Sequence, residues 1–154
     1  MIYTVGVADM RVSAQRGDLI ITHALGSCLG VTVHDPVACV GGLLHVMLPL
    51  SAIDPAKAQT NPFMFVDTGF PELLLECFET GALRQRLEVR VAGGANSWNR
   101  EEQDDFFQIG KRNLVVLRKL LWKNGLLLES YDVGGSTSRT MSLEIGTGKV
   151  TIKS

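Results

Sequence analysis

Residues 19–48 read LIITHALGSCLGVTVHDPVACVGGLLHVML, and this stretch organises the rest of the chain. It holds all three histidines and two of the three cysteines, so any chemistry is expected here first. Apolar and β-branched residues on both sides of the turn former Asp35-Pro36 predict a β-hairpin. A turn centred on Pro36-Val37 places Cys28 opposite His45.

Two cysteine and histidine pairs follow from that register. Directly opposed residues carry Cβ atoms about 4.5–5.5 Å apart on one face, so a thiol and an imidazole there can act as nucleophile and base. Cys28 with His45 meets this condition, and so does Cys39 with His34, about 20 Å further along the hairpin. The sequence favours Cys28, because Gly26-Ser27 before it permits a sharp turn that directs backbone N–H groups toward an oxyanion.

Two other interpretations remain open at this point. Pro36 does not suit the primed turns of tight hairpins, and a bulge at Gly41-Gly42 or a one-residue slip would move Cys28 and His45 to opposite faces. A free cysteine is also more commonly a small core residue than a nucleophile. The spacing of the cysteines and histidines matches no familiar short-loop zinc pattern, so no metal is expected, and nothing in the chain implies a cofactor.

The bulk properties narrow the class of protein. A length of 154 residues is typical of one domain, so residues 1–154 are expected to form a single unit with one core. A net charge of -1 and a pI near 6.3 do not indicate a protein that binds nucleic acid, because such proteins are usually basic. No apolar run reaches membrane-spanning length, and no signal peptide is recognisable. Three cysteines without a CxxC pair indicate reduced thiols, so the protein is expected to be soluble and cytoplasmic.

The rest of the chain predicts an α/β fold. A helical pattern over 63–81 contains Pro71, and its regular part is expected to begin there. A second helix is predicted over 110–123, and its basic residues are interpreted as a solvated face, not a binding patch. Strands are predicted over 2–12, 19–25, 87–92, 126–133, 140–145 and 149–152, with an irregular loop over 48–62 and a polar loop over 95–105. These elements favour a layered sandwich of mixed or antiparallel β-sheets with two main helices.

Seven segments resemble the CheD family in their order and spacing. They are THALGSC at 22–28, HDP at 34–36, HVMLP at 45–49, VAGGA at 91–95, IGKRN at 109–113, DVGG at 132–135 and TGKV at 147–150. The most specific parts are LGSC and HVMLP, and the resemblance covers nearly the whole chain. It implies a chemoreceptor glutamine deamidase of bacterial or archaeal chemotaxis, with the layered α/β fold of the cytotoxic necrotising factor type deamidases.

The resemblance also assigns roles to residues. The family's nucleophile falls on Cys28, its histidine on His45 and its supporting threonine on Thr22. A thiolate suits the reaction because a glutamine side-chain amide is a poor electrophile. We expect Cys28 to attack that carbonyl, His45 to protonate the departing ammonia and then activate water, and Thr22 to fix the imidazole. Backbone N–H groups around Ser27 and Cys28 are expected to hold the oxyanion, and Gly26 and Ser27 are candidate residues that support it.

The partners implied by the resemblance are the cytoplasmic helical bundle of methyl-accepting chemoreceptors and the CheC phosphatase, which many members of the family bind. Some members also cleave methylated glutamates as methylesterases, and the sequence does not specify which receptor glutamines are modified. One alternative is a regulatory binding module for CheC or receptors with little turnover. Another is a cysteine hydrolase that acts on a different protein's amide or ester.

Several positions depart from the family pattern or lack a defined role. Thr22 and His23 fall on opposite faces of their strand, and His23 is interpreted as a residue facing another layer instead of a competing base. His23, Ser97-Trp98 and Pro71 bear on receptor choice and CheC binding more than on chemistry. Glycines expected either to form turns or to line the cleft are Gly93, Gly94, Gly134 and Gly135, and candidate supporting side chains are Asp67 and Arg139.

Overall fold

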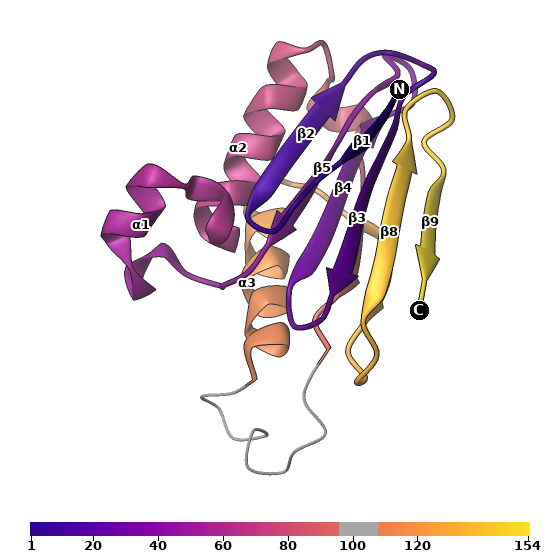
Figure 1. Cartoon of the computed structure of the whole chain (residues 1–154). Helices are drawn as coiled ribbons and strands as arrows, with labels where there is room; N and C mark the ends of the chain where they lie inside the picture. Colours follow the sequence, from indigo (N-terminus) through magenta and orange to yellow (C-terminus); the bar gives the residue numbers. More distant parts are fainter. Residues whose placement is uncertain (96–107) are drawn as a thin grey trace.

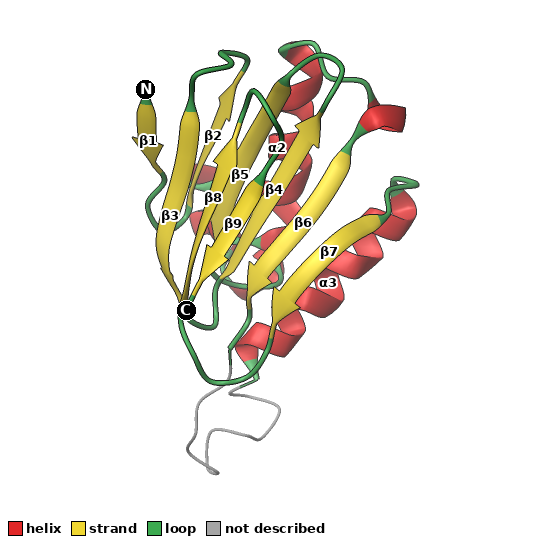
Figure 2. Ribbon diagram, turned by 90° about the vertical axis from the view of Figure 1, so that its right-hand side faces the viewer, coloured by secondary structure: helices red, strands yellow, loops and turns green. Residues whose placement is uncertain are grey.

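The computed structural model describes residues 1–95 and 108–154. Two β-sheets lie face to face, and two long helices cover the outer face of one of them, which gives an α/β/β arrangement (Figures 1 and 2). The sheet under the helices, sheet B, has the strand order β2-β5-β4-β6-β7, and the outer sheet, sheet A, has the order β1-β3-β8-β9.

The elements have the following bounds. The strands of sheet B are β2 Asp9–Ser13, β4 Leu29–Asp35, β5 Val40–Val46, β6 Glu88–Gly93 and β7 Leu128–Val133. The strands of sheet A are β1 Ile2–Thr4, β3 Leu19–Leu25, β8 Arg139–Glu144 and β9 Val150–Lys153. The helices are α1 Pro55–Thr60, α2 Val66–Glu79 and α3 Ile109–Lys123, with 3-10 turns η1 Ser51–Ile53, η2 Pro62–Met64 and η3 Arg84–Arg86.

Both sheets are mixed. Strand β1 runs parallel to β3 in sheet A and β6 runs parallel to β7 in sheet B, whereas the other pairs are antiparallel. The prediction of an α/β fold with mixed sheets and two main helices is therefore confirmed. No helix formed by residues 1–95 and 108–154 is both long and apolar enough to cross a membrane.

The predicted hairpin is the centre of sheet B. Every residue of β4 and β5 is buried, because α2 and α3 cover one face of these strands and sheet A covers the other. Alternate residues therefore enter two cores: Leu44 and Val46 pack under the helices, whereas Leu43 packs between the sheets. This double covering explains why apolar residues predominate on both faces of the hairpin.

The predicted register of the hairpin was wrong by two residues. His45 pairs with Gly30, not with Cys28, and His34 pairs with Gly41, not with Cys39. The connection is a four-residue turn over 36–39, in which the Asp35 carboxylate accepts hydrogen bonds from the N–H groups of Val37 and Ala38. A shift of two residues keeps each side chain on its face, so Cys28 and His45 still face the same layer.

Three predicted elements also need correction. The strand predicted over 2–12 is two strands in different sheets, β1 and β2. The loop predicted to be irregular over 48–62 contains α1, whose first turn is capped by the Asp54 carboxylate on the Lys57 N–H. Helix α2 begins at Val66 and not at Pro71. A proline inside a helix removes one hydrogen bond and crowds the carbonyl four residues before it, but the burial of Val66 and Phe70 holds the turn upstream of Pro71 in place.

We expect Leu73→Ala to destabilise the fold much more than Leu75→Ala in the same helix. Leu73 is fully buried in the core under α2, whereas Leu75 is 50% exposed. The buried substitution removes apolar contacts and leaves a cavity, at a cost of about 2–5 kcal/mol, and the exposed one should change stability by about 0.5 kcal/mol or less. Urea denaturation followed by circular dichroism measures both, and equal losses would contradict this packing.

Candidate active site

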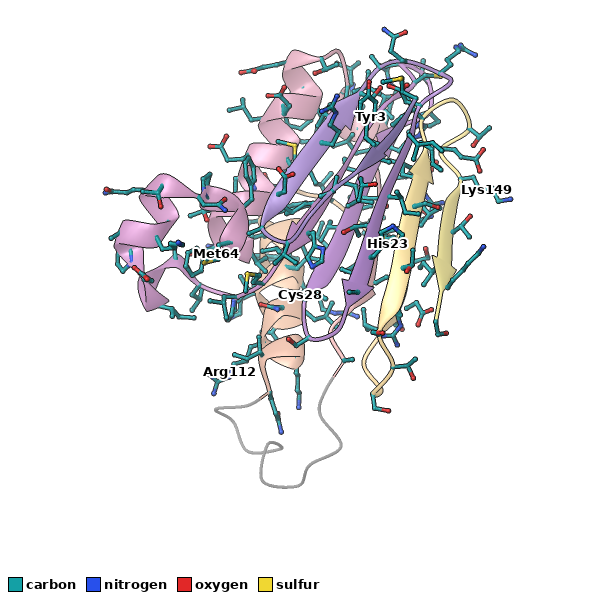
Figure 3. The ribbon with its side chains drawn as sticks, in the orientation of Figure 1. Tyr3, His23, Cys28, Met64, Arg112 and Lys149 are labelled. Carbon is teal, nitrogen blue, oxygen red and sulfur yellow. The ribbon has the colours of Figure 1, made fainter. Side chains whose placement is uncertain are left out.

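Of the three predicted catalytic residues, Thr22 and His45 come from different sheets and meet in the layer between them, and Cys28 packs against the core of that layer. Thr22 lies on β3 of sheet A and is fully buried, and His45 lies on β5 of sheet B and is 1% exposed. Cys28 lies in the bend between β3 and β4, where it is half-buried and packs against the core between the sheets. Figure 3 shows Cys28 at the same end of the molecule as Arg112, near the start of α3.

A hydrogen bond of 2.7 Å between Thr22 Oγ1 and His45 Nδ1 joins the two sheets. The Thr22 hydroxyl also donates to the backbone carbonyl of Val5 at 2.7 Å. A hydroxyl has one proton and a carbonyl can only accept, so Thr22 Oγ1 must accept from a protonated Nδ1 of His45. The neutral imidazole therefore carries its proton on Nδ1 and a free lone pair on Nε2.

His45 Nε2 is buried and has no hydrogen-bond partner among the described residues. Burial lowers the pKa of His45 below its usual 6.5, because the charged imidazolium is disfavoured in this layer. Burial also raises the pKa of Cys28 above its usual 9.0, while the Cys28 backbone N–H opposes this effect. Both shifts favour an uncharged thiol and an uncharged imidazole at rest, so Nε2 is suited to accept a proton during a reaction.

The loop that carries Cys28 is held by its three successive backbone carbonyls. Gly26 O accepts from the Ala95 N–H at 2.8 Å, and Cys28 O accepts from the Gly94 N–H at 2.9 Å. Between them, Ser27 O accepts from Asn113 Nδ2 at 3.2 Å. The N–H groups of Ser27 and Cys28 donate to no other described residue. The three carbonyls of this loop therefore have hydrogen-bond donors, whereas the N–H groups of Ser27 and Cys28 have no acceptor on another described residue.

Asn113 joins the nucleophile loop to the histidine strand. This residue of α3 is fully buried, and its Nδ2 donates to Ser27 O and also to Met47 O at 3.0 Å. Ser27 precedes Cys28, and Met47 lies two residues after His45. No role was predicted for Asn113, although it is a polar residue on the apolar side of the second helix and ends the IGKRN segment that resembles the CheD family.

Two glycines allow the backbone segments around the loop to approach closely. Gly93 has a φ of 107°, and a Cβ there would overlap the carbonyl oxygen of Cys28. A Cβ on Gly110, in the first turn of α3, would lie 2.5 Å from the carbonyl carbon of Gly94. Any larger residue at either position would push the supporting segments away from the loop.

The other residues considered in the sequence fall into three places. Arg139 supports the rim of the site, because its guanidinium donates to the carbonyls of Gly93 at 3.2 Å and Gly134 at 2.9 Å. Asp67 does not support it, since its carboxylate accepts from the N–H and hydroxyl of Ser51 in η1. His23 is exposed, so the prediction that it faces another layer was wrong, and it lines a groove of about 980 Å³ that Cys28 and His45 do not line. Ser97 and Trp98 lie outside the described residues.

The second cysteine and histidine pair forms no comparable site. His34 Nε2 is 2.7 Å from the carbonyl of Ile145, and the Cys39 thiol is 3.7 Å from the carbonyl of Pro36. Residues 1–95 and 108–154 contain no group of three or more His, Cys, Asp or Glu side chains placed to hold a metal ion.

Comparison with known proteins identifies the family. A family model described as CheD chemotactic sensory transduction matches residues 47–154, a range that begins just after His45. The relative from Syntrophus aciditrophicus, named probable chemoreceptor glutamine deamidase CheD 1, is 47% identical over 97% of this chain and 92% of its own length. The one from Solibacter usitatus, named probable chemoreceptor glutamine deamidase CheD, is 50% identical over 95% of this chain and 85% of its own length.

More distant similarity extends to archaea and to a solved structure. A probable chemoreceptor glutamine deamidase CheD from Thermococcus kodakarensis is 38% identical over 97% of this chain and 90% of its own length. The crystal structure of Neisseria meningitidis protein NMB0706, of family DUF152, is similar with a TM-score of 0.50 at 9% identity, over 88% of this chain and 64% of that one, and it shares the fold alone. The match of the family model and the near full-length relatives place this chain in the CheD family.

Proposed function

We propose that the protein is a chemoreceptor glutamine deamidase, which hydrolyses the side-chain amide of particular receptor glutamines to glutamate and releases ammonia. Membership of the CheD family and the names of its relatives support this activity. The observation that carries the proposal is the Thr22–His45 hydrogen bond, which leaves Nε2 of the imidazole as a free base in the layer that Cys28 also faces.

In the proposed first step, the Cys28 thiol transfers its proton to His45 Nε2 as its sulfur attacks the glutamine side-chain carbonyl. Because burial disfavours both a resting thiolate and a resting imidazolium, the proton moves only when the substrate is in place. The carbonyl oxygen becomes an oxyanion, and the free N–H groups of Ser27 and Cys28 stabilise its charge. Thr22 Oγ1 accepts from Nδ1 throughout, so the ring keeps its orientation when Nε2 is protonated.

In the second half, the oxyanion collapses, the carbon–nitrogen bond breaks and His45 returns its proton to the departing ammonia. The product is a thioester between Cys28 and the former glutamine side chain. His45 then takes a proton from water, hydroxide adds to the thioester carbonyl, and the carbon–sulfur bond breaks as His45 returns that proton to the sulfur, which gives glutamate and the free thiol. A methyl ester of glutamate would react in the same way with methanol as the leaving group, so methylesterase activity is included in the proposal.

The proposal places the protein in the cytoplasm, at the helical bundle of methyl-accepting chemoreceptors, with the CheC phosphatase as a second partner. It also includes a relation of the α/β/β arrangement to the cytotoxic necrotising factor type deamidases. The proposed location, partners and fold relation rest on the resemblance of the sequence to the CheD family. The proposed reaction uses no metal ion or cofactor.

The activity is tested by incubating the protein with cytoplasmic fragments of cognate chemoreceptors. Peptide mapping by mass spectrometry should find glutamines converted to glutamates by the wild-type protein and none by Cys28→Ala. Cys39→Ala is the matched control and should retain activity, because Cys39 lies in the hairpin turn. If no receptor fragment changes mass while Cys28→Ala still binds receptors or CheC, the protein is a regulatory binding module instead.

The protonation states predict how the reactivity of Cys28 depends on pH. Because the pKa of the Cys28 thiol is raised above 9.0, alkylation by iodoacetamide should be slow at pH 7 and should increase steadily as the pH rises toward 9 and beyond. Peptide mapping separates Cys28 from Cys39 and Cys77, which are buried. A fast rate that is constant from acidic to neutral pH would show a resting thiolate–imidazolium pair and would contradict the proposed proton transfer.

The contacts of Asn113 predict a loss of turnover when its side chain is removed. Asn113→Ala frees the carbonyls of Ser27 and Met47, so the loop and the histidine strand lose their common anchor. We expect kcat on receptor fragments to decrease about tenfold or more with little change in KM, since misplacement of reacting groups costs rate and not affinity. Asn124→Ala, at the other end of α3, is the control and should leave kcat unchanged. An unchanged kcat in Asn113→Ala would contradict the positioning role.

A further inference from the structure

The outer face of α3 is strongly basic. The helix contains five basic residues and no acidic residue. Its exposed positions are Lys111, Arg112, Val115, Arg118, Lys119, Trp122 and Lys123. Since the chain has a net charge of -1, the cations gathered on this helix give α3 a local excess of positive charge on a protein that is acidic elsewhere on balance.

These cations have no carboxylate partners within the described residues. The ion pairs of residues 1–95 and 108–154 involve none of them, and only Arg118 makes a ring contact, at 5.3 Å from the centroid of Tyr131. Lys119 and Lys123 are four residues apart on the helix, a spacing at which like charges repel. The sequence was interpreted as giving a solvated face here, but an exposed helix face with salt bridges alternates acidic and basic residues, whereas this one carries cations alone.

An apolar groove of about 440 Å³ runs along the first half of the same face. Its apolar side chains include Leu50 at 46%, Ile53 at 57% and Val115 at 45% exposure. Lys111 and Arg112 also line the groove, and Trp122, which is 83% exposed, lies two turns beyond Val115 on the same helix. Apolar side chains alternate here with cations, a pattern that is complementary to an amphipathic helix with acidic flanks.

The groove begins beside the candidate active site. Asn113 is hydrogen-bonded to the carbonyls of Ser27 and Met47. After Met47 the chain continues to Pro49 and Leu50, which form one wall of the groove. Arg112, which precedes Asn113 on α3, lies in the opposite wall. A helix lying in the groove would therefore have one end close to the loop that carries Cys28.

We propose that this surface, consisting of the exposed face of α3 and the wall formed by Pro49, Leu50 and Ile53, binds an acidic amphipathic α-helix of the substrate. The apolar stripe of that helix lies in the groove, and its carboxylates contact the cations of α3. The inference rests on the proposed deamidase function and names the chemistry by which the protein recognises the helix that carries its target glutamine. A groove between two walls suits a helix better than the flat surface of a bilayer.

The test compares three proteins: the wild type, a charge-reversed variant Lys111→Glu/Arg112→Glu/Lys119→Glu, and a control Arg16→Glu/Lys149→Glu/Lys153→Glu. All six positions are exposed, and the two variants change the net charge equally. The probe is a labelled synthetic helical peptide with an apolar stripe flanked by glutamates, whose binding is followed by fluorescence anisotropy. A matched peptide with lysines in place of the glutamates and vesicles of phosphatidylserine and phosphatidylcholine are the comparison ligands.

We expect the wild type and the control to bind the glutamate peptide, more weakly as salt increases, and the charge-reversed variant to bind it about tenfold more weakly or worse. On receptor fragments, the same variant should raise KM by a similar factor at unchanged kcat. Equal binding by both variants, equal binding of the lysine peptide, or binding of vesicles without the peptide would each overturn the proposal. If the wild type modifies no receptor fragment, the proposed deamidase function is wrong. The peptide-binding measurement then tests by itself whether the face of α3 is a docking surface.

Discussion

The hydrogen bond between Thr22 and His45 is the contact on which the candidate site depends. It crosses from one sheet to the other inside a largely apolar layer, where an unpaired imidazole N–H would be costly. The Val5 carbonyl fixes the direction of the Thr22 hydroxyl, and the hydroxyl in turn fixes the proton on Nδ1. One backbone acceptor in the N-terminal segment thus determines which nitrogen of His45 is free to react.

The nucleophile loop is positioned by backbone far away in the sequence. The segment after β6 and the start of α3 together hold the three carbonyls of residues 26–28, and Gly93 and Gly110 make that approach possible. Helix α3 consequently serves the site with two faces. Its buried face carries Asn113 against the loop, and its exposed face carries the cations that we propose receive the substrate. The same helix would then position the loop that carries Cys28 and bind the substrate.

The sequence predicted the layers and faces better than the contacts. Strand 19–25 was predicted with the bounds it has, because alternation and turn signals are local. The register of the hairpin was wrong because a four-residue turn stabilised by Asp35 replaces a tight one, yet Cys28 and His45 remain on one face because the error was an even number of residues. The roles of Asn113 and Gly110 were not predicted, since they arise from packing between segments distant in sequence.

The most direct test of this account is the tautomer of His45, which nitrogen NMR of the imidazole can report at a pH above 6.5, where the ring is neutral. We predict a proton on Nδ1 and an unprotonated Nε2 in the wild type, with that preference lost when Thr22→Val removes the accepting hydroxyl. A proton on Nε2 in the wild-type protein would contradict the account, because His45 would then have no lone pair with which to accept the proton of Cys28.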